Sequence, residues 1–567
     1  MPKIVLKAGS RPPWVGLAAA AWVQIAAGNA YNFPLYSTAL KKVLGFNQQQ
    51  ITILGVANDI GENVGLIPGI AINKFPPWAI LAVGVVSCFL GYGVLWLAVS
   101  QTLTALPYWL LFIALVVATN SNAWFGTAVL VTNMRNFPLS RGTVSGILKG
   151  YVGISAAVYT LVYNLALDDS ASKLLLFLTV GIPIICLLMM YFVRPCTPAS
   201  GEEDSSEHVH FIFTQAANVV LALYLLISTI ISDMVSLSYV VSYVLLGIMV
   251  VIILSPLAIP VKMTLFPARR KNNIPETDSF ESLVSGEGEL TTANPLLAPS
   301  SSATQLGSFL ENDYTSDVEY LLAVGEGAVK KKRRPKRGED FTFLEALVKA
   351  DFWLLWVVYF FGVGSGVTIL NNLAQIGVAF GLDDTTILLA VFSFCNFVGR
   401  LGSGAVSEHF VRSRTIPRTV WMTLAQIIMI ITFILFGFAV KHILYIATAL
   451  IGVCYGILYS VMVPTASELF GLEHFGVIYS FMLLGNPVGA LLFSGLLAGY
   501  VYDAEATKQG SSSTCVGPDC FRVTFFCLAG FCGLGTILSI ILTTRIRPVY
   551  QMLYSSGSFR VRQSSGH

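Results

Sequence analysis

The sequence predicts an all-α polytopic membrane protein, because its apolar residues gather in long runs and its charges gather between them. Of 567 residues, 55% are hydrophobic and only 11% are charged, whereas a soluble protein carries about 25% charged residues. The mean hydropathy is +0.72, and the formal net charge is only +3. These values exclude an ordinary soluble enzyme, a disordered chain and a nucleic-acid binder that relies on bulk charge.

Each apolar run is long enough to cross a bilayer, which needs about 20 residues. The first run follows Lys3, Lys7 and Arg11, as the apolar region of a signal peptide follows basic residues. It is longer than the apolar region of a signal peptide, which has roughly 7–15 residues. We therefore expect a first membrane helix, with cleavage near Ala26 as the alternative. The predicted spans are 14–36, 51–72, 78–99, 106–132, 143–167, 174–193, 211–231, 237–260, 352–377, 385–410, 418–440, 442–470, 475–502 and 521–544.

The charges between the runs predict the orientation of the chain. Lys and Arg favour cytoplasmic loops, and with fourteen spans Arg135, Arg141 and the basic run at 330–334 share one side with the N-terminus. Asp168 and Asp169 fall on the other side. We expect both termini and the long loop to be cytoplasmic. Twelve spans, with the middle pair not crossing, would give the same sidedness, so the count stays open between 12 and 14.

The spans divide the chain into five predicted parts. They are a six-helix bundle at 14–193, two linking transmembrane helices at 194–261, a disordered cytoplasmic loop at 262–351, a second six-helix bundle at 352–546 and a cytoplasmic tail at 547–567. The basic run in the loop favours contact with anionic membrane lipid over a nuclear signal. The segment 317–322 resembles an acidic dileucine sorting signal, so the plasma membrane and the vacuolar membrane are the expected locations.

Cysteine usage and the missing motifs narrow the chemistry. Cys515 and Cys520 lie in the last non-cytoplasmic loop, where a disulfide and two free thiols remain equal alternatives. Their spacing fits no zinc pattern. The sequence has no phosphate-binding loop and no nucleophile motif. We therefore expect no enzyme, no metal, no cofactor and no transport driven by ATP.

The two six-helix blocks have glycines and polar residues at corresponding positions, which indicates an internal repeat. Gly45 precedes the second span of the first block, and Gly381 takes the same place in the second block. The span that follows each glycine ends in a small residue, then an acid or amide four residues on, then a base. This pattern suits a tight cytoplasmic turn that latches a neighbouring helix, although two ordinary helix ends are the alternative. The predicted gating residues are Gly69, Asn73 and Lys74 in the first block and Gly404, Glu408 and Arg412 in the second.

These turns resemble the loop signature of the major facilitator superfamily, in which Asn73 stands where the family usually has Asp. The segments 28–34, 58–63, 133–138 and 146–150 read GNAYNFP, NDIGEN, NMRNFP and GILKG, and they resemble the plant nodulin-like branch of that superfamily. The second half, from Phe341-Thr342 and Asp351-Phe352-Trp353 onward, is similar to the domain of the nuclear-fusion-defective proteins.

The resemblance covers nearly the whole chain outside the central loop. It implies a major facilitator fold, for which we expect two six-helix bundles related by a pseudo-two-fold axis. The predicted spans add two extra central helices, about 14 spans in all. It also implies membrane transport. Members of the branch have been linked to small inorganic anions such as nitrate, and relatives in the wider group are called monocarboxylate-transporter-like.

Four charges lie at membrane depth, where an ionisable group is costly and usually functional. Asp59 and Glu62 share one helix face near the midplane. Two acids this close repel each other, so one of them could carry a proton; an ion pair or a helix-to-helix hydrogen bond is the alternative. Lys149, inside the fifth span, could contact Asp59, Glu62 or an anionic substrate, or extend to the interface.

Arg400 is the deep charge of the second half, and Asn396 lies one turn before it. Monocarboxylate porters resemble this arrangement but have Asp at the position of Asn396. Because of that difference, the role of the family's Asp in binding a proton is in doubt for Asn396. Arg400 remains a candidate anion contact, because its planar guanidinium suits carboxylate or nitrate. A structural Arg that binds helix ends is the alternative.

Polar side chains near the charges complete a candidate cavity, although amides also hold helices together. The predicted function is a secondary active transporter of a small anionic solute, nitrate-like or a monocarboxylate, that works by alternating access. Protons and membrane lipid are further expected partners, and nucleic acid is not. A membrane receptor or scaffold that retained the fold is the alternative. The candidate cavity residues are Asn29, Asn32, Asn371, Asn372 and Tyr455, with Tyr36, Asn120, Asn122, Trp124, Gln375 and Tyr459.

Overall fold

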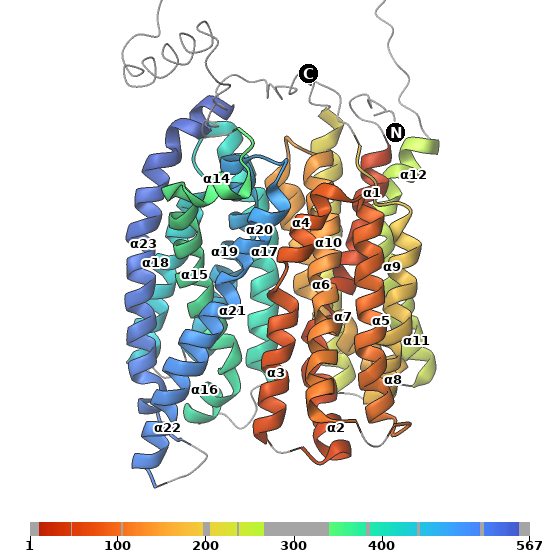
Figure 1. The fold of residues 1–567 in the computed structure, drawn as a ribbon, viewed down its shortest axis with the longest axis vertical. Helices are drawn as coiled ribbons and strands as arrows, with labels where there is room; N and C mark the ends of the chain where they lie inside the picture. The colour runs from red at the N-terminus through yellow and green to blue at the C-terminus, as the bar shows by residue number, and fades with distance from the viewer. Residues whose placement is uncertain are drawn as a thin grey trace, which may run out of the picture. The chain divides into compact units, whose positions relative to one another are not determined.

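The computed structural model describes residues 11–46, 48–103, 106–196, 205–234, 238–265, 339–381, 386–438, 443–510 and 515–554. This part of the chain is helical and has no strand, and its helices run side by side (Figure 1). Most of the predicted loop at 262–351, with the basic run and the sorting signal, lies outside the described residues.

The first half contains six spans, and two of them are broken. The first span consists of α1 (Pro12–Ala27), the 3-10 helix η1 (Gly28–Asn32) and α2 (Phe33–Leu44), and the second consists of α3 (Gln48–Asn63) and α4 (Leu66–Lys74). The others are α5 (Pro77–Val99), α6 (Tyr108–Asn136), α7 (Arg141–Ala166) and the run α8 (Ala171–Leu176), η2 (Phe177–Gly181) and α9 (Ile182–Met190).

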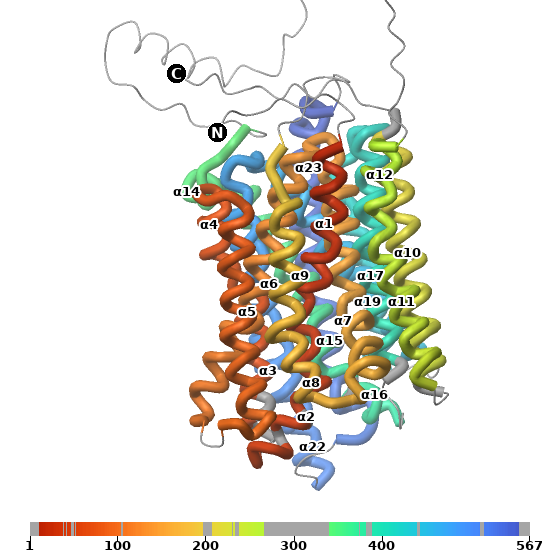
Figure 2. Tube along the Cα trace, turned by 90° about the vertical axis from the view of Figure 1, so that its right-hand side faces the viewer, coloured from red at the N-terminus to blue at the C-terminus, as the bar shows by residue number. Residues whose placement is uncertain are grey.

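Two further spans follow, α10 (Ser205–Met234) and the run α11 (Tyr239–Leu254), η3 (Ser255–Leu257) and α12 (Ala258–Leu265). They pack against α1 and α7, and α10 also contacts the second half at α17. Figure 2 shows this pair along one side of the helices.

The second half repeats the plan of six spans. Its elements are α14 (Phe343–Leu347), α15 (Ala350–Asn371), α16 (Leu373–Ala379), α17 (Thr386–Arg414), α18 (Thr419–Gly437), α19 (Leu444–Phe470), α20 (Phe475–Leu483), α21 (Gly485–Gly489), η4 (Ala490–Ala498), α22 (Gly499–Lys508) and α23 (Asp519–Tyr554).

Twelve helices in the described part are long and apolar enough to cross a membrane. The first two predicted spans are not among these twelve, because each is broken into helices of 16 residues or fewer. Apolar side chains face outward along the helices, as at Trp78, Val240 and Leu491, which are 58%, 73% and 60% exposed. Such a surface fits lipid, and helices satisfy their own backbone hydrogen bonds there.

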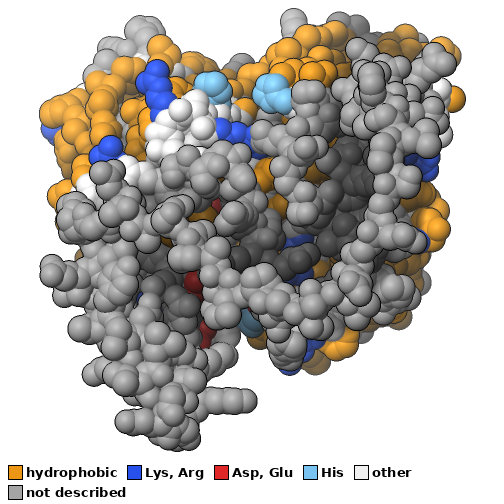
Figure 3. Space-filling view, turned by 90° about the horizontal axis from the view of Figure 1, so that it is seen from above, with side chains coloured by type: hydrophobic (Ala, Val, Ile, Leu, Met, Phe, Trp, Pro, Cys, Tyr) orange, Lys and Arg blue, Asp and Glu red, His pale blue; other side chains and the backbone are white. Residues whose placement is uncertain are grey.

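Both ends of the described chain lie at one end of the helices. The start of α1, the end of α12, α14 and the end of α23 all lie there (Figure 1). We call this the termini end and its opposite the far end. Seen from the termini end, Lys and Arg side chains are visible between the grey segments, and apolar side chains surround them (Figure 3).

Two boundaries differ from the prediction. The stretch predicted as loop up to 351 already contains α14, because Thr342 and Glu345 form a capping box: the Glu345 carboxylate accepts from the Thr342 amide at 2.9 Å. The tail predicted from 547 begins as helix, since α23 continues to Tyr554. Arg545 forms an ion pair with Asp351 at 2.8 Å, and Tyr550 is fully buried, which holds this end of α23 against the bundle.

The break between α3 and α4 has a local cause and a partner. Pro68 sits in the first turn of α4 and lacks a backbone N–H, so the helix cannot run through unchanged. The Asn120 amide of α6 donates to the carbonyl oxygens of Gly61 and Val64 at 2.9 and 2.8 Å. These carbonyls are thereby satisfied at membrane depth, where an unpaired one would be costly.

Close helix contact explains Gly28, at the break in the first span. A Cβ on Gly28 would lie 1.7 Å from the Ser155 hydroxyl of α7, so only glycine fits. The two glycines of the predicted repeat also correspond, since Gly45 and Gly381 both have left-handed φ values, +67° and +82°. The matching turns support the internal repeat.

Candidate functional site

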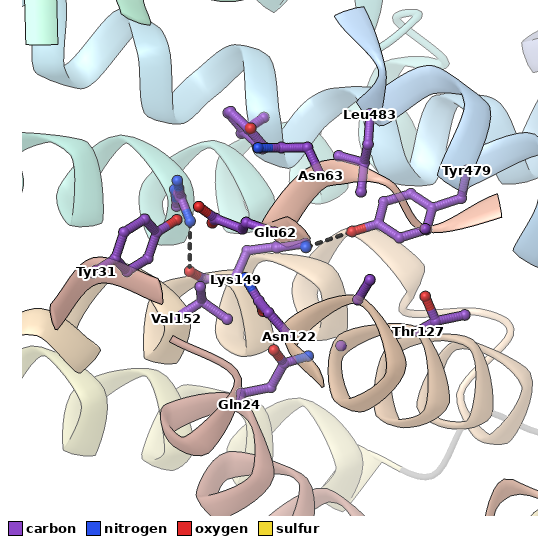
Figure 4. Close-up of a pocket in the computed structure, with 15 residues that line it drawn as sticks. Gln24, Tyr31, Glu62, Asn63, Asn122, Thr127, Lys149, Val152, Tyr479 and Leu483 are labelled. Atoms are coloured by element: carbon purple, nitrogen blue, oxygen red, sulfur yellow. Dashed lines mark hydrogen bonds between the residues drawn. The ribbon is translucent and has the colours of Figure 1, made fainter. Parts of the chain in front are cut away.

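A cavity lies at mid-depth between the halves of the described chain (Figure 4). The volume of the cavity is about 40 Å³, which is enough for water or a small solute. Discontinuous helices, here η1 and the α3–α4 break, supply part of the wall, as in many transporter sites. The cavity is lined by Gln24, Tyr31, Glu62, Asn63, Gly65, Asn122, Ala123, Gly126, Thr127, Lys149, Val152, Arg400, Tyr459, Tyr479 and Leu483.

Lys149 enters the cavity from α7. It lies eight residues after Arg141, where α7 begins, which places it about 12 Å along the helix. The residue is 8% exposed. Its ammonium group donates to the Tyr479 hydroxyl at 2.5 Å and lies 5.1 Å from the centre of that ring. The side chain therefore ends inside the cavity, on a phenol of the opposite half.

Arg400 enters the cavity from α17 and is 2% exposed. Its Nε donates to the Asn396 side-chain oxygen at 3.0 Å, and its Nη1 donates to the Lys149 carbonyl at 3.4 Å. The guanidinium also lies over the Tyr459 ring, 4.8 Å from its centre. The two cations thus come from opposite halves and meet at one place.

Glu62 is the carboxylate of the cavity wall. It interacts electrostatically with Lys149 and Arg400, and its side chain lies beside Tyr31 (Figure 4). Within the described residues, no ion pair of 4.0 Å or less joins Glu62 to either cation. Asp59, one turn nearer the far end on α3, is not part of the lining. With Glu62 ionised, the wall carries two positive charges and one negative charge.

Two of the other predicted cavity residues, Asn122 and Tyr459, belong to the lining, and the rest lie outside it. Asn29 connects helices: its amide donates to the Ser121 hydroxyl at 3.0 Å, and its oxygen accepts from Tyr92 at 2.9 Å. Asn372 likewise donates to Ser494 at 2.9 Å. Tyr455 packs beside a lining residue, with its ring 5.2 Å from that of Tyr459.

Two more predicted cavity residues also lie away from the lining. Asn371 is exposed at the end of α15. Asn32 is fully buried, and within the described residues its amide has no hydrogen-bond partner. The structure therefore brings Lys149, Arg400 and Glu62 together and leaves these asparagines outside the site.

Several lining residues were not among the predicted site residues. Tyr31, Gln24, Thr127 and Tyr479 carry no charge at neutral pH, and nothing in a single sequence separates them from other polar residues in apolar helices. Tyr31 alone had a signal, because it lies in the 28–34 segment that carries the resemblance.

The predicted gating residues of the second half lie against the first half. A Cβ on Gly404 would be 2.7 Å from the Gly142 carbonyl, so α7 and α17 meet backbone to backbone. Glu408 is buried and accepts a hydrogen bond from the Gly142 amide at 2.9 Å. Arg412 binds Glu408 at 2.9 Å and also donates to the Ser140 hydroxyl at 3.0 Å. We call these contacts of Glu408 and Arg412 the latch.

A buried network supports the latch and was not predicted. Arg418 is fully buried and donates to Glu408 at 2.8 Å and to Glu468 at 2.7 Å. The Tyr554 hydroxyl also donates to Glu468, at 2.7 Å. A buried Arg with two carboxylates holds its neighbours in one geometry, because removal of any member leaves an uncompensated charge.

The predicted gating residues of the first half lie at the matching place. A Cβ on Gly69 would lie 2.5 Å from the Gly476 carbonyl, so α4 and α20 are also in close contact. The Asn73 side-chain oxygen accepts from Arg135 at 2.9 Å, and Arg135 also donates to the Glu473 carbonyl at 2.9 Å. Lys74 is exposed. Both repeat turns therefore contact the opposite half at the termini end.

At the far end, Cys515 and Cys520 are joined by a disulfide. The bond closes the short turn before α23, where the sequence left a disulfide and free thiols as equal alternatives. Neither cysteine lines the cavity.

Comparison with known proteins agrees with this architecture. One solved structure, the proton:xylose symporter XylE bound to 6-bromo-6-deoxy-D-glucose, described as a major facilitator superfamily protein, matches with a TM-score of 0.52. The match covers 93% of this chain and 94% of that chain at 9% identity. The fold is therefore that of a major facilitator transporter, and the chain is a multi-pass integral membrane protein.

The family follows from the sequence comparisons. Residues 13–261 match the Nodulin-like family model, and residues 339–552 match the NFD4 C-terminal domain. The Arabidopsis thaliana protein NUCLEAR FUSION DEFECTIVE 4 is 31% identical over 95% of this chain and 90% of its own length. An uncharacterised major-facilitator-type transporter of Escherichia coli, YhjX, is 26% identical over 30% of this chain and 44% of its own. The chain belongs to the nodulin-like, NFD4-type family of major facilitator proteins, as its sequence motifs predicted.

Proposed function

We propose that this transporter carries a small anionic solute, nitrate-like or a monocarboxylate, by proton-coupled alternating access. One observation carries the proposal: two buried cations, Lys149 and Arg400, come from opposite halves and meet in a cavity whose lining contains a single carboxylate. The description of the E. coli relative as a transporter supports transport as the activity.

The charge of the cavity favours an anion. A cation inside the membrane costs several kcal/mol unless an opposite charge or polar groups compensate it. Lys149 is bound by the Tyr479 phenol and Arg400 by Asn396 and a backbone carbonyl, so both cations have neutral hydrogen-bond partners. An anion would offer each of them a charged acceptor, and charge-assisted hydrogen bonds are about twice as strong as neutral ones.

Proton coupling is assigned to the two acids of α3. A proton on Glu62 would remove the negative charge beside Lys149 and Arg400, which favours the entry of an anion. Asp59 lies one turn nearer the far end, on the same helix face. We assign Glu62 as the proton carrier and Asp59 as the group through which a proton reaches it from the far end.

Alternating access is supported by where the halves bind each other. The hydrogen bonds between them described above run from Lys149 and Arg400, at mid-depth, to the latch and Arg135 at the termini end. This arrangement is that of a transporter closed at the termini end. For the solute to leave there, the latch has to open. From the distribution of Lys and Arg we place the termini in the cytoplasm, and the protein in the plasma or vacuolar membrane.

Uptake into proteoliposomes tests the proposal. The full chain is reconstituted and supplied with labelled nitrate and short monocarboxylates at several external pH values. We expect uptake of at least one of them, and Lys149→Ala and Arg400→Ala should each raise its half-saturation concentration at least tenfold or abolish uptake. Gln375 was a predicted cavity residue, but it lies outside the lining on the exposed face of α16, so Gln375→Leu serves as the control.

Two results would contradict the proposal. If Lys149→Ala left the affinity for the anion unchanged, Lys149 would not be an anion contact. If the folded wild-type chain moved none of the anions, a receptor or scaffold that retained the fold would be the better account.

A further inference from the structure

Gln24 is a buried polar side chain without a partner in the cavity wall. It projects from the last turn of α1 and is 0% exposed. Within the described residues, neither its amide nitrogen nor its side-chain oxygen has a hydrogen-bond partner. An unsatisfied buried polar group is costly, and such groups in native proteins usually have a ligand, an ion or water as partner.

Gln24 belongs to an uncharged polar wall that also contains Asn122 and Thr127 of α6. None of the three side chains forms a hydrogen bond with another described residue. In Figure 4, Gln24 and Asn122 lie on the opposite side of Lys149 from Glu62. The cavity thus has a charged side, formed by Lys149, Arg400 and Glu62, and an amide side.

The two sides together define the chemistry of the ligand. The charged side has one positive charge in excess when Glu62 is ionised and two when Glu62 carries the proton, so it attracts an anion of charge −1 in both states. The amide side offers both donors and acceptors, because a Gln side chain has an N–H₂ group and a carbonyl oxygen. Nitrate has only acceptors and would leave the Gln24 oxygen without a donor. A hydroxyl group donates and accepts and would satisfy both atoms.

We propose that the solute is a short monocarboxylate that carries a hydroxyl group, held by its carboxylate on Lys149 and Arg400 and by its hydroxyl on Gln24. The inference rests on the proposed function and narrows it, because it excludes bare inorganic anions. The small volume of the cavity, about 40 Å³, fits a small solute. Asn122 lies on the same side of the cavity as Gln24 (Figure 4), and Gln24 is the residue that distinguishes the substrate.

The test compares two anions that differ by a single hydroxyl. Binding of 2-hydroxypropanoate, propanoate and nitrate to the purified full-length protein is measured by titration in detergent. A site that hydrogen-bonds a hydroxyl discriminates strongly against the analogue without it, because its own polar groups are left unpaired. We expect 2-hydroxypropanoate to bind at least tenfold more tightly than propanoate or nitrate.

Substitution of Gln24 locates the preference. Gln24→Leu should weaken the binding of 2-hydroxypropanoate to the level of propanoate and leave propanoate unchanged. Gln375→Leu makes the same chemical change on the exposed face of α16 and should alter neither. Thermal unfolding of both variants checks that they are folded, and Gln24→Asn, which keeps the amide, should retain part of the preference if Gln24→Leu does not fold.

Two patterns would overturn the inference, and they are distinguishable. If propanoate or nitrate binds as tightly as 2-hydroxypropanoate and still depends on Lys149 and Arg400, anion transport stands and the hydroxyl contact is wrong; Gln24 would then bind only water. If none of the three anions binds to the folded protein, the proposed function and the inference both fail.

Discussion

The latch offers a test in which the magnitude follows from the structure. Glu408 is buried and accepts hydrogen bonds from the Gly142 amide, Arg412 and Arg418. Glu408→Gln keeps the size of the side chain and removes its charge. A hydrogen bond to a charged group contributes about 1.5–3 kcal/mol. Arg418 keeps Glu468 as a partner, so we take the lower value, about 1.5 kcal/mol, for the bond that joins the halves.

That value corresponds to about a tenfold shift from the closed toward the open termini end. Hydrogen exchange measured by mass spectrometry on the reconstituted protein reports the shift. We expect about tenfold faster exchange in segment 139–146, which contains the Gly142 amide. Exchange should also be faster in segment 470–474, because its backbone carbonyls accept hydrogen bonds from Arg135 of the first half. This segment does not contact Glu408 directly, so it reports the separation of the halves.

The control and the refuting result are both specific. Glu505 forms an exposed ion pair with Lys508 near the far end, at 2.7 Å, and such pairs contribute about 0–1 kcal/mol. Glu505→Gln should therefore leave both segments unchanged. Faster exchange confined to 139–146 would show that Glu408 stabilises only the start of α7. Unchanged exchange in both segments would refute the latch.

Two further predictions concern proton coupling and helix contact. Glu62→Gln should abolish the increase of anion uptake at low external pH while solute exchange continues, and Asp59→Asn should slow proton-driven uptake; an unchanged pH profile in both variants would make the acids structural. Gly404→Ala places a Cβ 2.7 Å from the Gly142 carbonyl, so α7 and α17 should separate and segment 139–146 should exchange faster even with the carboxylate of Glu408 present. Wild-type exchange in Gly404→Ala would mean that the helices accommodate the methyl group elsewhere.

The fold could be predicted because its determinants are long and regular. Apolar runs separated by charge identify membrane helices by their composition alone, and the paired glycines marked the repeat. The breaks in the first two spans were missed, although Pro34 and Pro68 are visible in the sequence. An apolar run continues through a break in a helix, so hydropathy does not reveal it; what permits the second break is the Asn120 amide, a contact between distant segments.

The end of α23 shows the opposite error. The apolar run ends at 544, and the predicted tail begins soon after it. The helix continues because Arg545 pairs with Asp351 and Tyr550 is buried. Both are contacts with segments far away in the sequence. Composition therefore gives the part of a helix that lies in lipid, and tertiary contacts determine how far it continues beyond.

The candidate site could be predicted in its charges and only in part in its neutral wall, where Asn122 and Tyr459 were predicted and Gln24 was not. Lys149, Arg400 and Glu62 stand out because charged residues are rare in membrane helices. Asparagines do not stand out in this way, because amides also bind helix to helix, and Asn29 does so here. Gln24 differs from Asn29 only in having no partner, and that difference exists only in the folded chain.

The site and the latch are connected through two rigid helices, which gives a final prediction. On α7, Lys149 lies seven residues after Gly142, and on α17 Arg400 lies eight residues before Glu408, so each helix carries one latch group and one cavity cation about two turns apart. Tyr479 binds Lys149 from the second half and so stabilises the same closed state as the latch. An anion that replaces the phenol on Lys149 would loosen one of these two contacts.

A double-mutant cycle measures this connection. Tyr479→Phe keeps the ring near Lys149 and removes the hydroxyl. Exchange in segment 470–474 gives the free energy of opening for each variant. If both contacts stabilise a single closed state, the change in this free energy for the double variant Tyr479→Phe and Glu408→Gln should differ from the sum of the two single changes by at least about 0.5 kcal/mol. Additive effects would mean that the cavity and the latch open independently, and solute binding would then have no route through α7 and α17 to the termini end.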